Sequence, residues 1–197
     1  ETDAGMGLRR RLALILAALD EDDADDAFAA IRLANPAGLG EVEKGDVRQS
    51  NPRFTLIEAM HLAKDRDRIA NAYVTAYSDV FDFALPALET ARACGERADL
   101  AITALHMALL AEFPDSHIVR KWGPDRAREV QDEALRLKPV WSPIVASKAF
   151  TDLLKFDAQL KEKGLNPGTT ADFVVTTIFT ELLTRHRAHG SPSEDPT

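Results

Sequence analysis

Cysteine is nearly absent from this chain of 197 residues, which contains a single one, Cys94. A lone cysteine excludes an intramolecular disulfide, and no spacing of cysteine and histidine residues fits a zinc site. The sequence therefore predicts a reducing, cytoplasmic setting.

Long apolar runs and an excess of positive charge are also missing. No apolar run reaches the roughly 18 to 20 residues that span a bilayer, and the N-terminal residues lack the layout of a signal peptide. Lysine and arginine number 24 against 32 aspartates and glutamates, a net charge of -8. This balance disfavours nonspecific binding to nucleic acid or to an anionic membrane, so we expect neither partner. A local basic pair, Arg120 and Lys121, is still able to hold a phosphate group.

Alternating apolar and polar residues, which would indicate half-buried strands, do not occur convincingly. Apolar residues recur instead at helical spacing, and even the β-branched stretch 174–177 lies inside a helical period. We therefore predict an all-α fold, a bundle of about seven to nine helices in a single domain (residues 1–189), followed by a disordered polar tail (190–197). The main expected helices cover residues 7–19, 87–93, 99–112, 124–137, 147–163 and 170–186. A further helix is expected after an aspartate cap at residues 20–23. The stretch from residue 55 to about 85 is expected to form one long or kinked helix, or two helices joined end to end.

The longest predicted connection covers residues 35–52, where one proline and two glycines in 35–40 break the helical periodicity. Loops longer than about 12 residues are uncommon in compact domains and are often functional. This segment is thus a candidate lid or ligand loop. Asp46 lies within it and either turns the chain or contributes to a site.

The first chemically unusual segment is residues 113–123, which place an acid, a hydroxyl, an imidazole and two cations between two amphipathic helices. Asp115 and Ser116 are good N-cap residues, and His117, Arg120 and Lys121 then share one helical face. The simpler interpretation is a capped, solvated first turn. The functional interpretation is a set of side chains that handle protons and phosphate.

The second unusual segment is residues 164–172, before an apolar helical run. Thr169 and Asp172 have the spacing of a capping box, and Gly168 lets the backbone come close to whatever lies at the helix start. A helix N-terminus is also an anion site, although a well-made N-cap explains the same residues. If both segments serve a ligand, we expect them to line one pocket that residues 35–52 can cover.

These two segments together resemble the triphosphoribosyl-dephospho-coenzyme A synthases, whose members carry an Asp-Ser/Thr-His, Arg-Lys-x-Gly segment and a later Asn-Pro-Gly-Thr-Ser/Thr-Ala-Asp segment. A third match is the run Met60-His-Leu-Ala-Lys-Asp-Arg-Asp-Arg-Ile-Ala70. Matches extend from Ala30 to Asp172, which is most of the chain. The combination is more specific than any single motif.

The resemblance implies an enzyme that uses ATP and dephospho-coenzyme A, releases adenine and forms a prosthetic-group precursor. A ribose 2'-hydroxyl would attack C1' of the ATP ribose, which requires cations or a metal on the triphosphate and groups that move protons. The implied cofactors are ATP and Mg²⁺. The implied site comprises Asp115 and His117 for proton handling; Arg120, Lys121, Arg66, Asn166, Gly168, Thr169 and Thr170 for nucleotide binding; and Asp46, Asp67 and Asp172 for magnesium.

The chain departs from the family in one respect. Family members are longer and carry N-terminal motifs, among them Lys-Pro-Gly-Asn and Thr-Asn-Leu-Gly, that this sequence lacks. Either these residues are a subset of a longer polypeptide, or this branch has lost part of the active site. Two alternatives to the main interpretation follow: a non-catalytic nucleotide-binding or scaffold protein, and a divergent enzyme acting on another cofactor precursor, such as that of a one-carbon carrier. A homodimer is a further possibility.

Overall fold

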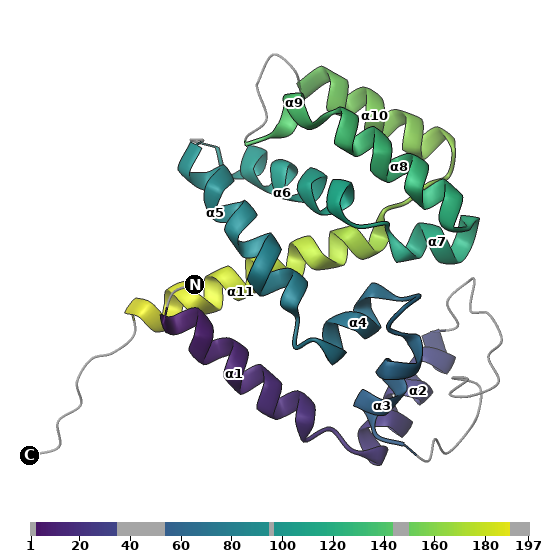
Figure 1. Cartoon of the computed structure of the whole chain (residues 1–197), viewed down its shortest axis with the longest axis vertical. Coiled ribbons are helices and arrows are strands. Elements are labelled where there is room, and N and C mark those ends of the chain that lie inside the picture. Colours follow the sequence, from purple (N-terminus) through teal and green to yellow (C-terminus); the bar gives the residue numbers. More distant parts are fainter. Residues whose placement is uncertain (1–2, 35–53, 95–96, 144–149, 190–197) are drawn as a thin grey trace, which may run out of the picture.

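The computed structural model describes residues 3–34, 54–94, 97–143 and 150–189. Within these ranges the chain forms eleven α-helices, one short π-helix and no strand, which confirms the predicted all-α class with slightly more helices than expected (Figure 1). In chain order they are α1 (Asp3–Ala17), α2 (Glu21–Ala34), α3 (Leu56–Ala63), α4 (Arg68–Val74), η1 (Asp79–Ala84), α5 (Leu85–Cys94), α6 (Ala98–Glu112), α7 (Ser116–Trp122), α8 (Pro124–Arg136), α9 (Lys138–Trp141), α10 (Phe150–Glu162) and α11 (Gly168–His189).

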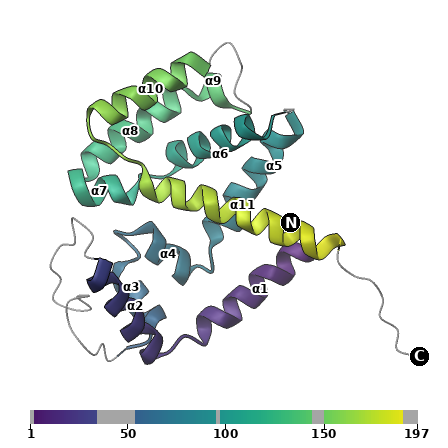
Figure 2. The same cartoon turned by 180° about the vertical axis from the view of Figure 1, so that it is seen from behind.

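Helix α11 runs through the middle of the molecule, with α6, α8 and α10 on one side and α1, α2 and α3 on the other (Figures 1 and 2). The main hydrophobic core lies around α6, which packs against α5, α8 and α11. Leu105, Leu109 and Leu110 of α6 are almost completely buried there. Burying side chains of this size stabilises the fold by roughly 1.5–3 kcal/mol each. The core therefore holds the starts of α7 and α11 in place.

The stretch from residue 55 to about 85 differs from the expected helix, since it is divided into α3, α4 and η1. The first break occurs because Asp67 caps a new helix, its carboxylate accepting the Ile69 backbone N–H at 2.8 Å. The second break occurs at Ala76 and Tyr77, whose φ angles of 48° and 59° are left-handed and incompatible with a continuing helix. Both breaks redirect the chain so that α4 and η1 approach α11.

Residues 138–143, which the sequence predicts as a linker, begin instead with the short helix α9. Its Trp141 is buried, and the indole Nε1 donates a hydrogen bond of 2.8 Å to the carbonyl oxygen of Ala134. A buried indole needs such a partner. Pro139 lies in the first turn of α9, where its missing N–H removes no intrahelical hydrogen bond, so it is compatible with the helix.

Three predictions fall outside the described residues: the loop 35–52, Asp46 within it, and the tail 190–197. No helix in the described part of the chain is long and apolar enough to cross a membrane.

Candidate functional site

The two unusual segments of the sequence meet at Asp115, which joins the N-termini of α7 and α11. Its Oδ1 accepts the Ile118 backbone N–H at 3.1 Å, as an N-cap of α7. Its Oδ2 accepts both the backbone N–H and the side-chain hydroxyl of Thr170, at 2.7 and 2.8 Å. The Asp115 residue is 1% exposed, so this carboxylate is fully committed to holding the two helix starts together.

A second connection between the segments is made by hydroxyl groups. The Thr169 Oγ1 accepts the His117 backbone N–H at 3.1 Å and accepts a hydrogen bond of 3.1 Å from Ser116. The Ser116 hydroxyl in turn accepts the Arg68 backbone N–H at 3.3 Å. Thr169 therefore does not form the capping box with Asp172 that its spacing predicts, because its hydroxyl is used by α7 instead.

The His117 ring lies against Gly168, at the start of α11. A Cβ atom on Gly168 would lie 3.4 Å from Cγ and 3.5 Å from Nδ1 of the imidazole, which is ordinary van der Waals contact, so the ring packs directly beside the Gly168 backbone. The Nδ1 is 3.2 Å from Nη2 of Arg120. Because a guanidinium only donates, Nδ1 is the acceptor, and the neutral ring carries its proton on Nε2.

Asp172 lies one turn into α11 and is exposed. Partial desolvation of its carboxyl raises the pKa of Asp172, the negative charge of Asp115 raises it further, and His117 opposes both effects. The carboxylates of Asp115 and Asp172 and the ring of His117 thus share one electrostatic environment.

Arg68, which sequence reasoning left out of the site, carries a largely buried guanidinium. Its Nη2 donates to Oδ2 of Asp79 at 3.0 Å. The guanidinium carbon lies 3.9 Å from the ring centroid of Phe113 and 4.3 Å from that of Phe173. Burial lowers the pKa of Arg68, and Asp79 opposes this shift. The available signal is its helical spacing: Arg68 lies four residues before the fully buried Ala72, on the inner face of α4.

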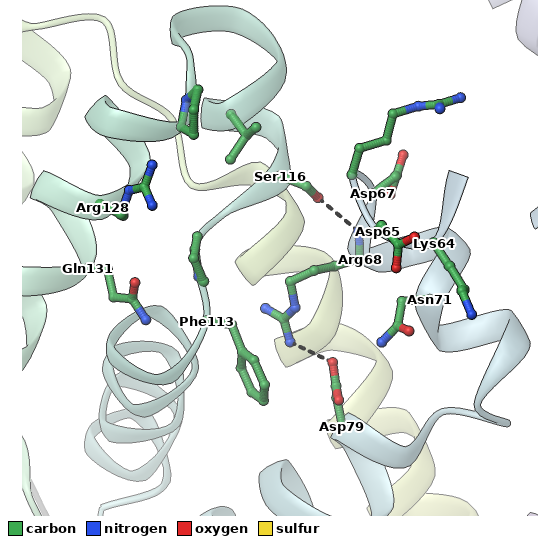
Figure 3. A pocket seen from close by; sticks show the side chains of 14 residues that line it. Lys64, Asp65, Asp67, Arg68, Asn71, Asp79, Phe113, Ser116, Arg128 and Gln131 are labelled. Carbon is green, nitrogen blue, oxygen red and sulfur yellow. Dashed lines mark hydrogen bonds and ion pairs between the residues drawn. The ribbon is translucent and has the colours of Figure 1, made fainter. Parts of the chain in front are cut away.

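A cavity of about 430 Å³ opens beside Arg68, between the α3–α4 turn and the start of α8 (Figure 3). The turn contributes residues 64–67, the α6–α7 junction contributes Phe113, Pro114 and Ser116, and α8 contributes Arg128 and Gln131. Its size is within the range of small-molecule sites. Ser116 belongs both to this cavity and to the hydroxyl network, so the cavity adjoins the junction of α7 and α11.

The predicted site residues are divided between these places. Arg66 and Asp67 line the cavity, and Nη1 of Arg66 donates to the Leu62 carbonyl at 3.2 Å. Arg120 and Lys121 are exposed on α7 and do not line the cavity, and Asn166 is exposed with its carbonyl accepting the Gly168 N–H at 2.8 Å.

The predicted magnesium ligands are not gathered into one cluster. Among the described residues, no group of three or more histidine, cysteine, aspartate or glutamate side chains is placed to hold a metal. Asp46 lies outside those residues. Asp67 lies in the cavity with Asp65, and Asp172 lies on α11.

His106, on the partly buried side of α6, allows a prediction of how the free energy of unfolding depends on pH. Burial lowers the pKa of His106 below its usual 6.5, while Asp115 and Asp157 oppose this shift. The unfolded chain therefore binds a proton at pH values where the folded chain does not, so stability is full above about pH 6.5 and falls as the pH drops below it. We expect His106→Gln to flatten this part of the stability curve by up to about 1.4 kcal/mol per pH unit.

The measurement is urea unfolding at a series of pH values between 5 and 8. The matched control is His61→Gln, which removes an exposed histidine on α3 and should keep the wild-type slope. An unchanged slope in the His106 variant would contradict the prediction.

The sequence model of the ATP:dephospho-CoA triphosphoribosyl transferase family matches residues 2–191 of this chain. The chain belongs to this family. The resemblance found in the sequence is therefore confirmed.

Curated relatives of this transferase family match over part of the chain. The 2-(5''-triphosphoribosyl)-3'-dephosphocoenzyme-A synthase of Pectobacterium atrosepticum is 33% identical over 103 residues, which is 52% of this chain and 32% of the relative. The corresponding enzyme of Pectobacterium carotovorum subsp. carotovorum, named as a probable synthase, is 31% identical over the same coverage. The matched region thus spans about a third of the length of these relatives.

A solved structure shares the fold. The structure is that of an Archaeoglobus fulgidus protein that is provisionally named a triphosphoribosyl-dephospho-CoA synthase. It superimposes on this chain with a TM-score of 0.65 at 22% sequence identity. The alignment covers 91% of this chain and 72% of that chain. At this identity the likeness shows the fold alone, which is all-α in this chain.

Proposed function

We propose that this chain transfers the triphosphoribosyl group of ATP to dephospho-coenzyme A, or to a similar nucleotide-like acceptor, with release of adenine. The observation that carries the proposal is the family match over residues 2–191, in a chain whose two family segments join at Asp115. The segments lie about 55 residues apart in sequence. A fold that brings such segments together beside a cavity is typical of an active site.

The reaction forms one bond and breaks another. The oxygen of the acceptor's hydroxyl group forms a bond to C1' of the ATP ribose, while the bond from C1' to the adenine nitrogen breaks. The hydroxyl loses its proton and the departing adenine gains one. The protein must therefore donate a proton or hydrogen bond to adenine and hold the acceptor oxygen close to C1'.

His117 fits the role of donor to the leaving adenine. Its Nδ1 is occupied by Arg120, so the Nε2–H group is the one available to a substrate. Asp115 has no free oxygen for proton transfer and acts as a positioning residue through the starts of α7 and α11. The assignment of Arg120 and Lys121 to the triphosphate, made from the sequence, stays a prediction.

Magnesium fits the carboxylates of the α3–α4 turn. Mg²⁺ is commonly held by one or two protein carboxylates together with substrate phosphates and waters, so a cluster of three protein ligands is not required. Asp65 and Asp67 both line the cavity. When bound there, the ion would neutralise phosphate charge.

The proposed activity is tested by incubating the protein with ATP, MgCl₂ and dephospho-coenzyme A and measuring free adenine by chromatography. We expect adenine to accumulate only when the acceptor is present, together with a product heavier by the triphosphoribosyl group. A reaction without acceptor is the control for simple hydrolysis. If neither dephospho-coenzyme A nor a panel of nucleotide-like cofactor precursors gives adenine, the enzymatic proposal is wrong.

A further inference from the structure

The cavity beside Arg68 is lined mainly by charged and polar side chains. Four of its fourteen lining residues are apolar: Phe113, Pro114, Val119 and Pro124. The other ten residues are charged or polar, so they offer ionic contacts and hydrogen bonds to the polar part of a substrate.

Two cations at the cavity have no carboxylate partner. Neither Lys64 nor Arg66 forms an ion pair with any residue in the described part of the chain, although both line the cavity. Arg128 also lines it, and its partner Asp125 lies outside the lining and is 92% exposed, so this ion pair is weak. Three positive side chains are thus available to an anion.

A fourth cation lies deeper in the cavity wall. The Arg68 side chain is only 12% exposed, and its Nε and Nη1 have no hydrogen-bond partner in the described structure. An unpaired buried N–H destabilises the folded state, and native proteins keep few such groups. The positive charge is therefore maintained at a cost to stability, next to a cavity where an anion would be attracted to it.

Carboxylates at the same cavity narrow the choice of ligand. Besides Asp79, which pairs with Arg68, the cavity is lined by Asp65 and Asp67, which lie in the same turn as Lys64 (Figure 3). A free phosphate chain would be repelled by these two carboxylates. A phosphate chain that carries Mg²⁺ would instead be attracted by both kinds of side chain, because the carboxylates bind the metal and the cations bind the outer oxygens.

We propose that this cavity binds the polyphosphate chain of a magnesium–nucleoside triphosphate, with Lys64 and Arg66 contacting phosphate oxygens and Asp65 and Asp67 facing the metal. The identity of the substrate in this assignment rests on the proposed function. The arrangement of charged side chains around the cavity does not depend on which reaction the protein catalyses. The Ser116 hydroxyl, at the edge of the cavity, is bonded to the Arg68 backbone and to Thr169. The reacting end of the substrate would thus extend from the cavity toward His117, the next residue in α7.

Inorganic tripolyphosphate is the probe, and isothermal titration calorimetry in MgCl₂ measures its binding. We expect Lys64→Ala and Arg66→Ala each to weaken binding about 10- to 100-fold, the usual effect of losing a hydrogen bond to a charged group. Asp65→Asn should weaken binding in MgCl₂, and replacing MgCl₂ with EDTA should weaken binding to the wild-type protein. The matched control is Arg126→Ala, which removes an arginine of α8 that pairs with Glu129 outside the cavity.

Several results would overturn the assignment: no binding to the wild-type chain, wild-type affinity in both cation variants, or equal binding in EDTA. A loss of binding in Arg120→Ala with Lys121→Ala, but not in the cavity variants, would place the phosphates on α7 instead. Adenine release is measured in parallel. If the cavity variants release adenine with an unchanged KM for ATP, the phosphate subsite is refuted and the proposed function stands. If the cavity variants weaken tripolyphosphate binding but the wild-type protein releases no adenine, the subsite is supported and the proposed function is refuted.

Discussion

Replacing Asp115 with alanine should lower the free energy of unfolding by about 3–5 kcal/mol, because three buried donors would be left unsatisfied at about 1–3 kcal/mol each. The Ile118 N–H, the Thr170 N–H and the Thr170 hydroxyl would all lose their acceptor. Ile118 and Thr170 are both fully buried, so water cannot replace the carboxylate without opening the junction. Urea unfolding followed by circular dichroism gives the value.

Replacing Asp115 with asparagine removes the negative charge but keeps the size and shape of the side chain. Its single oxygen can satisfy either the α7 amide or the Thr170 groups but not both, so Asp115→Asn should cost roughly half as much, about 1.5–3 kcal/mol. Asp125→Ala is the matched control, since this aspartate lies in the first turn of α8 and is 92% exposed. It should change stability by no more than about 0.5 kcal/mol. Equal effects of the alanine variants at 115 and 125 would contradict the proposed junction.

The sequence predicts those parts of the fold that depend on neighbouring residues. Asp115 was recognisable as an N-cap because that role depends on its distance from Ile118 along the chain. Gly164 follows directly after the predicted helix 147–163, and it has the left-handed φ of 67° that is common where a helix ends at a glycine. Periodicity likewise gives the class of fold, because it reports which faces of each helix are apolar.

Contacts between distant segments are what the sequence pattern does not contain. The second oxygen of Asp115 is used by Thr170, 55 residues away, and the hydroxyl of Thr169 is used by α7 rather than by its own helix. Both residues look like ordinary capping residues until the helices are placed. The family resemblance predicted that these segments cooperate, but not through which atoms.

Arg68 shows a different limit of sequence reasoning. Its neighbours in the run Lys64–Arg68 are all charged, and such a run usually indicates a solvated turn. Apart from its spacing of four residues from Ala72, nothing in the sequence indicates that Arg68 turns inward between Phe113 and Phe173, while Arg66 stays exposed. The sequence-based site therefore included Arg66 and omitted the arginine that the fold buries.

Replacing His117 with alanine should reduce kcat for adenine release by about 10²- to 10⁴-fold, the range that general acid–base groups contribute. This expectation depends on the proposed function and on the Nε2–H group being directed to the substrate by the contact of Nδ1 with Arg120. Tripolyphosphate binding should change less than threefold, because the His117 ring does not line the cavity. The variant would then have lost the chemical step and kept the phosphate subsite.

Glutamine and arginine variants distinguish a proton donor from a packing residue. His117→Gln keeps a side-chain N–H of similar reach, so it should recover part of the activity and show a flatter pH profile than the wild-type enzyme. Arg120→Ala frees Nδ1 and should lower kcat by a smaller factor, about tenfold, because the ring loses its fixed tautomer but not its donor. The control is Arg126→Ala on α8, which lies outside both the cavity and the junction. If His117→Ala and this control have the same kcat, His117 is only the side chain that packs against Gly168, and the donor to adenine must be sought elsewhere.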